Sequence, residues 1–271
     1  MSVDFSVKDK VIVITGATGV ICSALAKELA GLGAKLVLIN RHAESGRALE
    51  AEICTSGGEG ISLIADVLDK ASLLEAREQT LRHFGRVDVL INGAGGNKPE
   101  ATTSKTKSFF DLDLEAFRDV LDLNLTGAFL TTQVFGEELV KQGKGMVINV
   151  ASMTSFQPLS NVVAYGAAKA AIVNFTQWMA VHFNENYCKE IRVNAIAPGF
   201  LISNQNRFLL QKEDGSPTER GARVLAKTPM RRYGEPSEMV GAVVWLCSDA
   251  SSFVNGAVIP IDGGFSAASG V

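Results

Sequence analysis

Residues 11–40 read VIVITGATGVICSALAKELAGLGAKLVLIN, and this stretch decides the fold. An apolar run enters a turn that contains Gly16 and Gly19, an amphipathic stretch follows from Ser23 to Leu32, and a second apolar run occupies 36–39. Continuous apolar strands separated by helices are typical of a parallel sheet that is covered on both faces. The stretch therefore predicts a strand, a helix beginning near Ser23 and a second, parallel strand.

The same alternation continues to the end of the chain. Amphipathic stretches such as 44–53 and 71–84 separate seven short apolar runs, at 11–14, 36–39, 61–64, 87–91, 146–150, 191–196 and 257–261. We expect an α/β fold with one doubly wound parallel sheet of about seven strands, of the Rossmann type, and helices on both faces. Such a sheet accounts for residues 1–271 as a single domain, with an insertion around 200–228 expected to form a substrate loop.

Composition and charge exclude several classes of function. The net charge of -3 offers no excess of Lys and Arg for binding phosphates, so we expect no nucleic-acid partner. The four cysteines lie far apart without a Cys-x-x-Cys spacing, so neither a metal site nor a disulfide framework is indicated. No apolar run reaches the roughly eighteen residues of a membrane span, and the N-terminus lacks a leader pattern. We expect a cytoplasmic protein without a membrane partner.

The glycine-rich turn is also a candidate binding element. It reads Thr15-Gly16-Ala17-Thr18-Gly19-Val20-Ile21-Cys22 and connects the first strand to the first helix. Backbone N–H groups and the positive end of a helix dipole in such a turn can hold a pyrophosphate. A merely tight connection is the alternative, because the turn alone is a weak signal. Two further motifs follow the third and fourth strands: Asp66-Val67 and Asn92-Gly93-Ala94-Gly95.

Tyr165 and Lys169 lie four residues apart in an Ala-rich stretch that is expected to be helical. This spacing puts a phenol and an ammonium on one helix face. Two unit charges about 4 Å apart at an effective dielectric near 20 interact by roughly 4 kcal/mol, or about three pKa units. Lys169 can therefore lower the pKa of Tyr165 toward the range of a general acid or base. Surface pairs at this spacing are common, so the pair alone is a weak signal.

Ser152 follows the apolar run 146–150 directly, so its hydroxyl is expected at the carboxyl end of a buried strand. There it can polarise a carbonyl or alcohol oxygen in front of the tyrosine. Taken in chain order, the Thr-Gly turn, Asp-Val, Asn92-Gly93-Ala94-Gly95 (Asn-Asn-Ala-Gly in the family), Asn, Ser, Tyr-x-x-x-Lys and Pro-Gly motifs resemble the short-chain dehydrogenase/reductase family. The resemblance spans essentially the whole chain.

The resemblance implies a role for each matching residue. Tyr165 is implied to be the acid/base, Ser152 to hydrogen-bond the reacting oxygen, and Lys169 to lower the tyrosine pKa and bind the nicotinamide ribose. Asn124 is implied to hold a water in a proton relay; a helix-interior asparagine that bonds locally is the alternative. Hydride transfer is implied to be direct, without a metal. Contacts with the dinucleotide are implied for Gly16, Thr18, Gly19, Val20, Ile21, Asp66, Val67, Asn92, Gly93, Ala94, Pro198 and Gly199.

The chain departs from the family pattern in the glycine turn. The second and third family glycines fall on Val20 and Cys22. Because the second glycine lets backbone approach the pyrophosphate, Val20 is expected to crowd the phosphates, unless Gly19 relieves the turn. We expect weaker dinucleotide binding with an intact fold. The non-enzyme alternative is a dinucleotide-binding sensor or scaffold with impaired turnover.

The choice of cofactor is expected to depend on the end of the second strand. Asn40 stands where NAD-dependent proteins usually carry an acidic residue for the ribose 2′-OH. Arg41 follows at once, and an arginine can accommodate the 2′-phosphate of NADP. A solvated arginine is the alternative. The sequence slightly favours NADP(H) over NAD(H).

Within the family, the segment 194–207 together with 95–98 and 262–266 resembles the short-chain type of D-mannonate oxidoreductase. That resemblance implies a sugar acid as substrate, most readily D-mannonate/D-fructuronate. Candidate contacts for its carboxylate and hydroxyls are Asn97, Lys98, Ser152, Gln205 and Arg207. The enzyme alternative is another polyol or keto-sugar-acid dehydrogenase, such as gluconate 5-dehydrogenase.

Two helical stretches, 120–139 and 164–182, carry broad apolar faces. By resemblance, family members pair these helices across a two-fold axis. We expect a homotetramer, or at least a homodimer.

Overall fold

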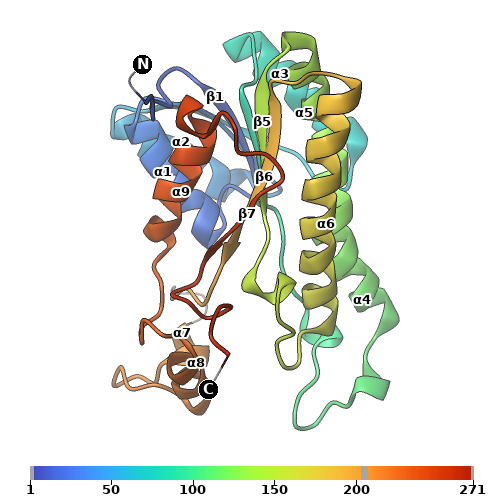
Figure 1. Ribbon diagram of the computed structural model, residues 1–271, viewed down its shortest axis with the longest axis vertical. Coiled ribbons are helices and arrows are strands. Elements are labelled where there is room, and N and C mark those ends of the chain that lie inside the picture. The colour runs from blue at the N-terminus through green and yellow to red at the C-terminus, as the bar shows by residue number, and fades with distance from the viewer. Residues whose placement is uncertain (1–2, 203–206, 270–271) are drawn as a thin grey trace.

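The computed structural model describes residues 3–202 and 207–269. Within them, parallel strands form one seven-stranded sheet in the order β3-β2-β1-β4-β5-β6-β7 (Figure 1). The strands are β1 (Val11–Thr15), β2 (Lys35–Asn40), β3 (Glu59–Ile64), β4 (Val89–Asn92), β5 (Gly145–Val150), β6 (Ile191–Pro198) and β7 (Val258–Ile261). The predicted doubly wound parallel sheet is confirmed. All strands point the same way, so their carboxyl ends meet along one edge of the sheet.

Helices cover both faces of the sheet. In Figure 1, α1, α2 and α9 lie on one side of the strands and α5 and α6 on the other. The helices are α1 (Val20–Gly31), α2 (Ala43–Thr55), α3 (Lys70–Phe84), α4 (Leu114–Leu121), α5 (Gly127–Gln142), α6 (Val163–Asn186), α7 (Arg207–Leu210), α8 (Glu219–Lys227) and α9 (Val240–Cys247). None of the helices in the described ranges is long and apolar enough to cross a membrane.

Two separate cores explain why the strands are apolar at every position. Successive side chains of a strand point to opposite faces, and both faces are covered here. Ile12 and Ile14 of β1 pack into the core that includes α1 and α9. Val11 and Val13 pack into the core that includes α3 and α5. The sheet is therefore fixed from both sides, and its carboxyl edge is a rigid support for loops.

The first helix begins earlier than predicted, at Val20 instead of near Ser23. Its N-cap is Gly19, which has an extended backbone and no capping side chain. A glycine N-cap leaves no polar side-chain signal in the sequence, so the start of the helix was placed too late. Val20 and Ile21 consequently belong to the first helical turn, and only Gly16–Gly19 form the loop.

The segments that follow β4 and β6 extend beyond the carboxyl edge of the sheet. After β4 the chain forms the short helical turns Pro99–Ala101 and Phe109–Asp111 before α4. After β6 it forms α7 and α8, which lie together below the strands in Figure 1. The insertion expected around 200–228 therefore contains two short helices, with the non-helical residues 211–218 between them. Gln205, one of the predicted substrate contacts, lies outside the described residues.

Candidate functional site

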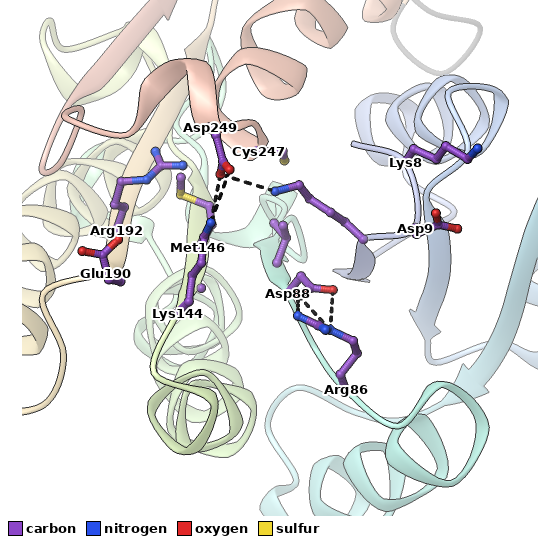
Figure 2. Close-up of a pocket in the computed structure, with 13 residues that line it drawn as sticks. Lys8, Asp9, Arg86, Asp88, Lys144, Met146, Glu190, Arg192, Cys247 and Asp249 are labelled. Atoms are coloured by element: carbon purple, nitrogen blue, oxygen red, sulfur yellow. Dashed lines mark hydrogen bonds and ion pairs between the residues drawn. The ribbon is translucent and has the colours of Figure 1, made fainter. Parts of the chain in front are cut away.

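Cavities open at both edges of the sheet, and their charges differ. A cavity of about 280 Å³ lies at the amino-terminal edge, lined by charged residues that precede the strands (Figure 2). Lys144 Nζ lies 3.1 Å from Asp249 Oδ1, and Arg86 Nε lies 3.0 Å from Asp88 Oδ1. These cations are engaged within the cavity. Ligands of open α/β sheets bind at the opposite, carboxyl edge, where the predicted site residues lie.

Gly16 shapes the loop between β1 and α1. Its φ is +61°, and a Cβ at this position would lie 2.8 Å from Ala94 Cα. Thr15 fixes the neighbouring loop after β4, because its Oγ1 accepts hydrogen bonds from Gly93 N at 3.1 Å and Ala94 N at 3.2 Å. The two loops that were predicted to contact the dinucleotide are thus held together by the Thr15 hydroxyl and by the close approach of Gly16 to Ala94.

These loops border a pocket of about 190 Å³ at the carboxyl edge. The amino end of α1 begins at the pocket, and its N-cap Gly19 offers no side chain to satisfy the first N–H groups. Unsatisfied N–H groups and the helix dipole favour a phosphate, so the residues fit a dinucleotide. The lining residues are Gly16, Thr18, Gly19, Ile39, Asn40, Arg41, His42, Ala65, Val67, Gly93, Ala94, Gly95 and Leu123.

The crowding of bound phosphates by Val20 stays a prediction. Val20 starts α1 and does not line the pocket, and Ile21 packs partly against the core. Gly19, one residue earlier, takes the position next to the pocket. Cys22 also lies inward, because a Cβ on Gly93 would come within 2.1 Å of its Sγ. The side chains of Val20 and Cys22 therefore do not line the pocket.

Asn40 and Arg41 both line the pocket, as predicted for the residues that choose the cofactor. Asn40 is buried, its Oδ1 accepts a hydrogen bond from Thr18 N at 3.0 Å, and its Nδ2 donates to Leu38 O. Arg41 is exposed and, among the described residues, has neither a hydrogen-bond nor an ion-pair partner. Asn40 thus supports the glycine loop, and Arg41 offers an uncompensated charge at the pocket.

The motifs after β3 and β4 support the local structure as well as the pocket. Val67 lines the pocket, whereas the Oδ1 of Asp66 accepts a hydrogen bond from Leu68 N. Asn92 is buried, and its Nδ2 donates to Thr132 Oγ1 and to Asn149 Oδ1, each at 2.9 Å. The Asn92 side chain therefore points into the protein and ties β4 to β5 and α5, and the contact of Asn92 with the dinucleotide stays a prediction.

Ser152 and Tyr165 come together as predicted. Ser152 is buried after β5, and Tyr165 lies in the first turn of α6. Burial raises the pKa of Tyr165, and its hydrogen bond with Ser152 acts in the opposite direction. The direction differs from the predicted lowering by Lys169, because removal of the phenolate from water dominates. Tyr165 is thus a protonated phenol at neutral pH.

Lys169 lies one turn further along α6 and is buried. Its Nζ donates to Val150 O at 2.7 Å and lies 5.6 Å from the centroid of the Tyr165 ring. A Cβ on Gly95 would lie 3.2 Å from the same Nζ, so the ammonium is adjacent to the pocket. Burial lowers the pKa of Lys169 to about 8, and the nearby Cys22 opposes this change. Lys169 connects Tyr165 with the dinucleotide pocket.

Asn124 lies in a single π-helical turn, Asp122–Thr126, between α4 and α5. It is buried, and its Nδ2 donates to Gly96 O at 2.7 Å and to Val120 O at 2.8 Å. Its Oδ1 accepts from Gly96 N at 3.2 Å. The bond to Val120 O is the local hydrogen bond of a helix-interior asparagine, which was the alternative interpretation. The two bonds to Gly96 also fix the loop after β4. The water-holding role of Asn124 stays a prediction.

The remaining predicted contacts lie on the segments that follow β4 and β6 or at the end of β6 itself. Pro198 ends β6, and Gly199 packs so closely against Asp262 that a Cβ would lie 2.6 Å from Asp262 Cα. Lys98 forms an ion pair with Asp119. Asn97 Nδ2 donates to Thr102 Oγ1, and Arg207 donates to Gln211 Oε1, each at 2.9 Å. The two predicted cations for a substrate carboxylate, Lys98 and Arg207, are both engaged with other side chains.

Sequence reasoning missed several residues around the pocket. Thr15 holds the loop after β4 through its hydroxyl, and His42 and Leu123 line the pocket. Thr15 lies within the quoted turn motif, and His42 directly follows Asn40 and Arg41, so proximity in sequence was an available signal. Leu123 had none, because its position depends on the π-helical turn.

Comparison with known proteins agrees with this geometry. A family model described as enoyl-(acyl carrier protein) reductase matches residues 16–266. The uncharacterized oxidoreductase UxuB of Bacillus subtilis (strain 168) is 49% identical over 271 residues, covering 97% of this chain and 96% of the relative.

Solved structures extend the agreement to cofactors. One, from Haemophilus influenzae, holds NAD and has been ascribed D-mannonate oxidoreductase activity; it is 46% identical, with a TM-score of 0.92 and 98% of each chain covered. Another, from Beutenbergia cavernae, holds NADP at low occupancy and has been ascribed gluconate 5-dehydrogenase activity; it is 33% identical, with a TM-score of 0.85, and 97% of this chain and 99% of that chain are covered. The chain therefore belongs to the short-chain dehydrogenase/reductase family and is an NAD(P)-dependent oxidoreductase.

Proposed function

We propose that the protein interconverts D-mannonate and D-fructuronate, with Tyr165, Ser152, Lys169 and Asn124 as its catalytic residues. The observation that carries the proposal is the grouping of Tyr165, Ser152 and Lys169 next to the dinucleotide pocket. Ser152 follows β5, and the other two residues lie in α6. Similarity to the Haemophilus influenzae protein supports the choice of substrate.

The side chains divide the proton chemistry among them. Bound nicotinamide would accept or supply the hydride. In the direction of reduction, Tyr165 Oη donates a proton to the carbonyl oxygen of the substrate, which suits a phenol whose pKa is raised by burial. Ser152 holds the same oxygen, and the Lys169 ammonium stabilises the phenolate that remains. Asn124 keeps the loop of Gly96 fixed beside these groups.

For the cofactor, we propose a slight preference for NADP(H) over NAD(H). Arg41 is exposed at the pocket and has no partner among the described residues, so its charge is available to a 2′-phosphate. Asn40 carries no negative charge that would repel such a phosphate. NAD(H) is the competing cofactor, because the Haemophilus influenzae structure holds NAD.

A substrate screen tests the proposal. Purified protein is mixed with D-fructuronate, 5-ketogluconate or a neutral ketose, each with NADH and with NADPH, and absorbance of the reduced nicotinamide is followed. D-fructuronate is expected to show the highest kcat/KM. A higher kcat/KM for 5-ketogluconate would favour a gluconate 5-dehydrogenase, which the similarity to the Beutenbergia cavernae protein makes the second candidate.

Replacement of Tyr165 tests the assignment of the acid/base. Tyr165→Phe removes the proton donor and is expected to lower kcat by about 10² to 10⁴, with cofactor binding nearly unchanged. Retained NADH binding by Tyr165→Phe, measured by calorimetric titration, shows that the variant is folded. Near-normal turnover by Tyr165→Phe would exclude it as the acid/base.

A further inference from the structure

A second, larger pocket at the carboxyl edge carries charge that the proposed mechanism does not use. It measures about 440 Å³ and lies between α8 and the loop 158–161. Its wall holds three cations and no carboxylate. The lining residues are Pro158, Leu159, Ser160, Asn161, Phe200, Arg220, Arg223, Val224, Lys227 and Phe265.

The three cations all come from one face of α8. Arg220, Arg223 and Lys227 follow the spacing i, i+3 and i+7, which aligns side chains along a helix. Thr218 caps the helix, since its Oγ1 accepts a hydrogen bond from Gly221 N at 3.0 Å. Val224 is buried among the same turns. The face that carries the cations is therefore held toward the pocket.

The three cations differ in whether a negatively charged side chain lies close to them. Lys227 Nζ donates to Gln157 Oε1 at 2.7 Å and lies 4.6 Å from the Phe265 ring centroid, so it is fixed by neutral groups. Arg223 lies 3.5 Å from Glu219 in an exposed pair, which screens it little. Arg220 has no partner among the described residues. The pocket thus keeps a net positive charge that favours an anion.

The opposite wall joins this pocket to the proposed catalytic residues. The loop 158–161 connects the turn after Ser152 to α6, whose first turn holds Tyr165. Gln157 links the loop to Lys227 and, through its Nε2, to Ser266 O at 2.6 Å. The pocket therefore borders the chain segment that runs from Ser152 to Tyr165.

The shape of the pocket suits a small organic acid. Phe200 and Phe265 pack edge to face with their centroids 5.3 Å apart, which gives an apolar wall for a carbon chain. Ser160 and Asn161 add polar groups for hydroxyls. An arginine fork matches a carboxylate better than a lysine does, because it can donate two parallel hydrogen bonds.

We propose that Arg220 and Arg223 bind the carboxylate of the substrate and select acids over neutral polyols. The inference rests on the proposed function, since it assigns the acid-recognising residues of the same site. It also replaces Lys98 and Arg207, which do not line this pocket.

Binding measured without turnover tests the assignment. With NADH or NADPH bound, the alcohol D-mannonate cannot react, because reduced nicotinamide accepts no hydride, and calorimetric titration then reports affinity alone. D-mannonate is expected to bind wild-type protein more tightly than D-mannitol does. Arg220→Gln and Arg223→Gln should each weaken D-mannonate by about ten- to hundredfold and leave D-mannitol unchanged. Arg82→Gln, an exposed cation on α3, controls for net charge, and Arg223→Lys should retain part of the affinity.

Two outcomes would overturn the assignment: equal affinity of wild-type protein for D-mannonate and D-mannitol, or unchanged D-mannonate affinity in both Gln variants. Unchanged D-mannitol binding shows that a variant is folded. The proposed function fails separately, when D-mannonate binding depends on Arg220 and Arg223 but D-fructuronate is not reduced with either cofactor. In that case the pocket binds carboxylates, but the substrate of the enzyme is a different acid.

Discussion

At the scale of single residues, Cys22 and Gly93 occupy one shared volume. A Cβ on Gly93 would lie 2.1 Å from Cys22 Sγ, which no real side chain could tolerate. The family motif has glycine at the position of Cys22 and asparagine at the position of Gly93. In this chain the larger side chain therefore lies on α1 and the glycine lies in the loop after β4. Burial raises the pKa of Cys22 to about 12, and the protonated thiol therefore acts as a packing group.

Double substitution tests this exchange. Cys22→Gly should destabilise the protein by about 2–3 kcal/mol through a cavity and a helical glycine. Gly93→Ala should cost about 1–3 kcal/mol through overpacking. Because each change relieves the other, the double variant should be at least about 1 kcal/mol more stable than the sum predicts. The measurement is denaturant unfolding.

Gly96→Ala serves as the control for an added methyl group in the same loop, because its nearest neighbour would be Leu123 Cδ2 at 3.7 Å. That variant should unfold like the wild-type protein. Additive effects in the Cys22 and Gly93 double variant would show that the two side chains do not share space.

The buried ammonium of Lys169 makes stability depend on pH. Its pKa is about 8 in the folded protein against an ordinary value of 10.5, so between these values the unfolded chain binds a proton that the folded chain has lost. Stability contributed by this group therefore rises with pH across that window. Relative to Lys169→Met, the free energy of unfolding of the wild-type protein should increase by on the order of 1–3 kcal/mol from pH 8 to pH 10.5.

Matched unfolding curves for the two proteins at several pH values give this difference. A constant difference from pH 7 to pH 10.5 would mean that Lys169 keeps its ordinary pKa on folding. Over the same window the dinucleotide should bind more weakly to the wild-type protein, since the ammonium next to the pocket loses its charge.

At the scale of elements, periodicity predicted the sheet and most helices because those patterns are local. Apolar runs at 11–14 and 36–39 became β1 and β2 with small changes at their ends. The π-helical turn at Asp122–Thr126 was not predictable, since an extra residue in one helical turn leaves no mark in the periodicity. That turn nevertheless sets the positions of Asn124 and Leu123 at the site.

Motif order likewise placed Ser152, Tyr165 and Lys169 together, but it did not predict the direction of each side chain. Asn92 points into the core because Thr132 and Asn149 supply its hydrogen bonds, and these partners lie 40 and 57 residues away in the chain. The pKa of Tyr165 depends on burial, which the four-residue spacing to Lys169 does not determine. Local patterns thus identified the residues, and packing determined what each one does.

At the scale of the whole molecule, α5 and α6 leave an apolar surface uncovered in the single chain. Phe129 is 43% exposed, Trp178 57% and Tyr187 58%. A hollow of about 360 Å³ between the two helices is lined by these rings together with Phe175 and Val140. Contiguous apolar surface of this kind is typical of a subunit interface. We propose that two copies pair through α5 and α6 as part of a homotetramer.

Substitution of Trp178 tests that interface, because aromatic side chains near the centre of an interface contribute most of its binding energy. Trp178→Asp should weaken association by more than about 2 kcal/mol and shift the sedimenting species toward the 28.8 kDa monomer at micromolar concentration. Phe5→Asp is the control, since Phe5 is a similarly exposed ring outside the hollow between α5 and α6. A wild-type protein that sediments only as a monomer would contradict the proposal, and an unchanged assembly in Trp178→Asp would move the interface to another surface.

Because α6 also holds Tyr165 and Lys169, loss of assembly should be measured together with kcat, so that a change in the site can be separated from a change in association.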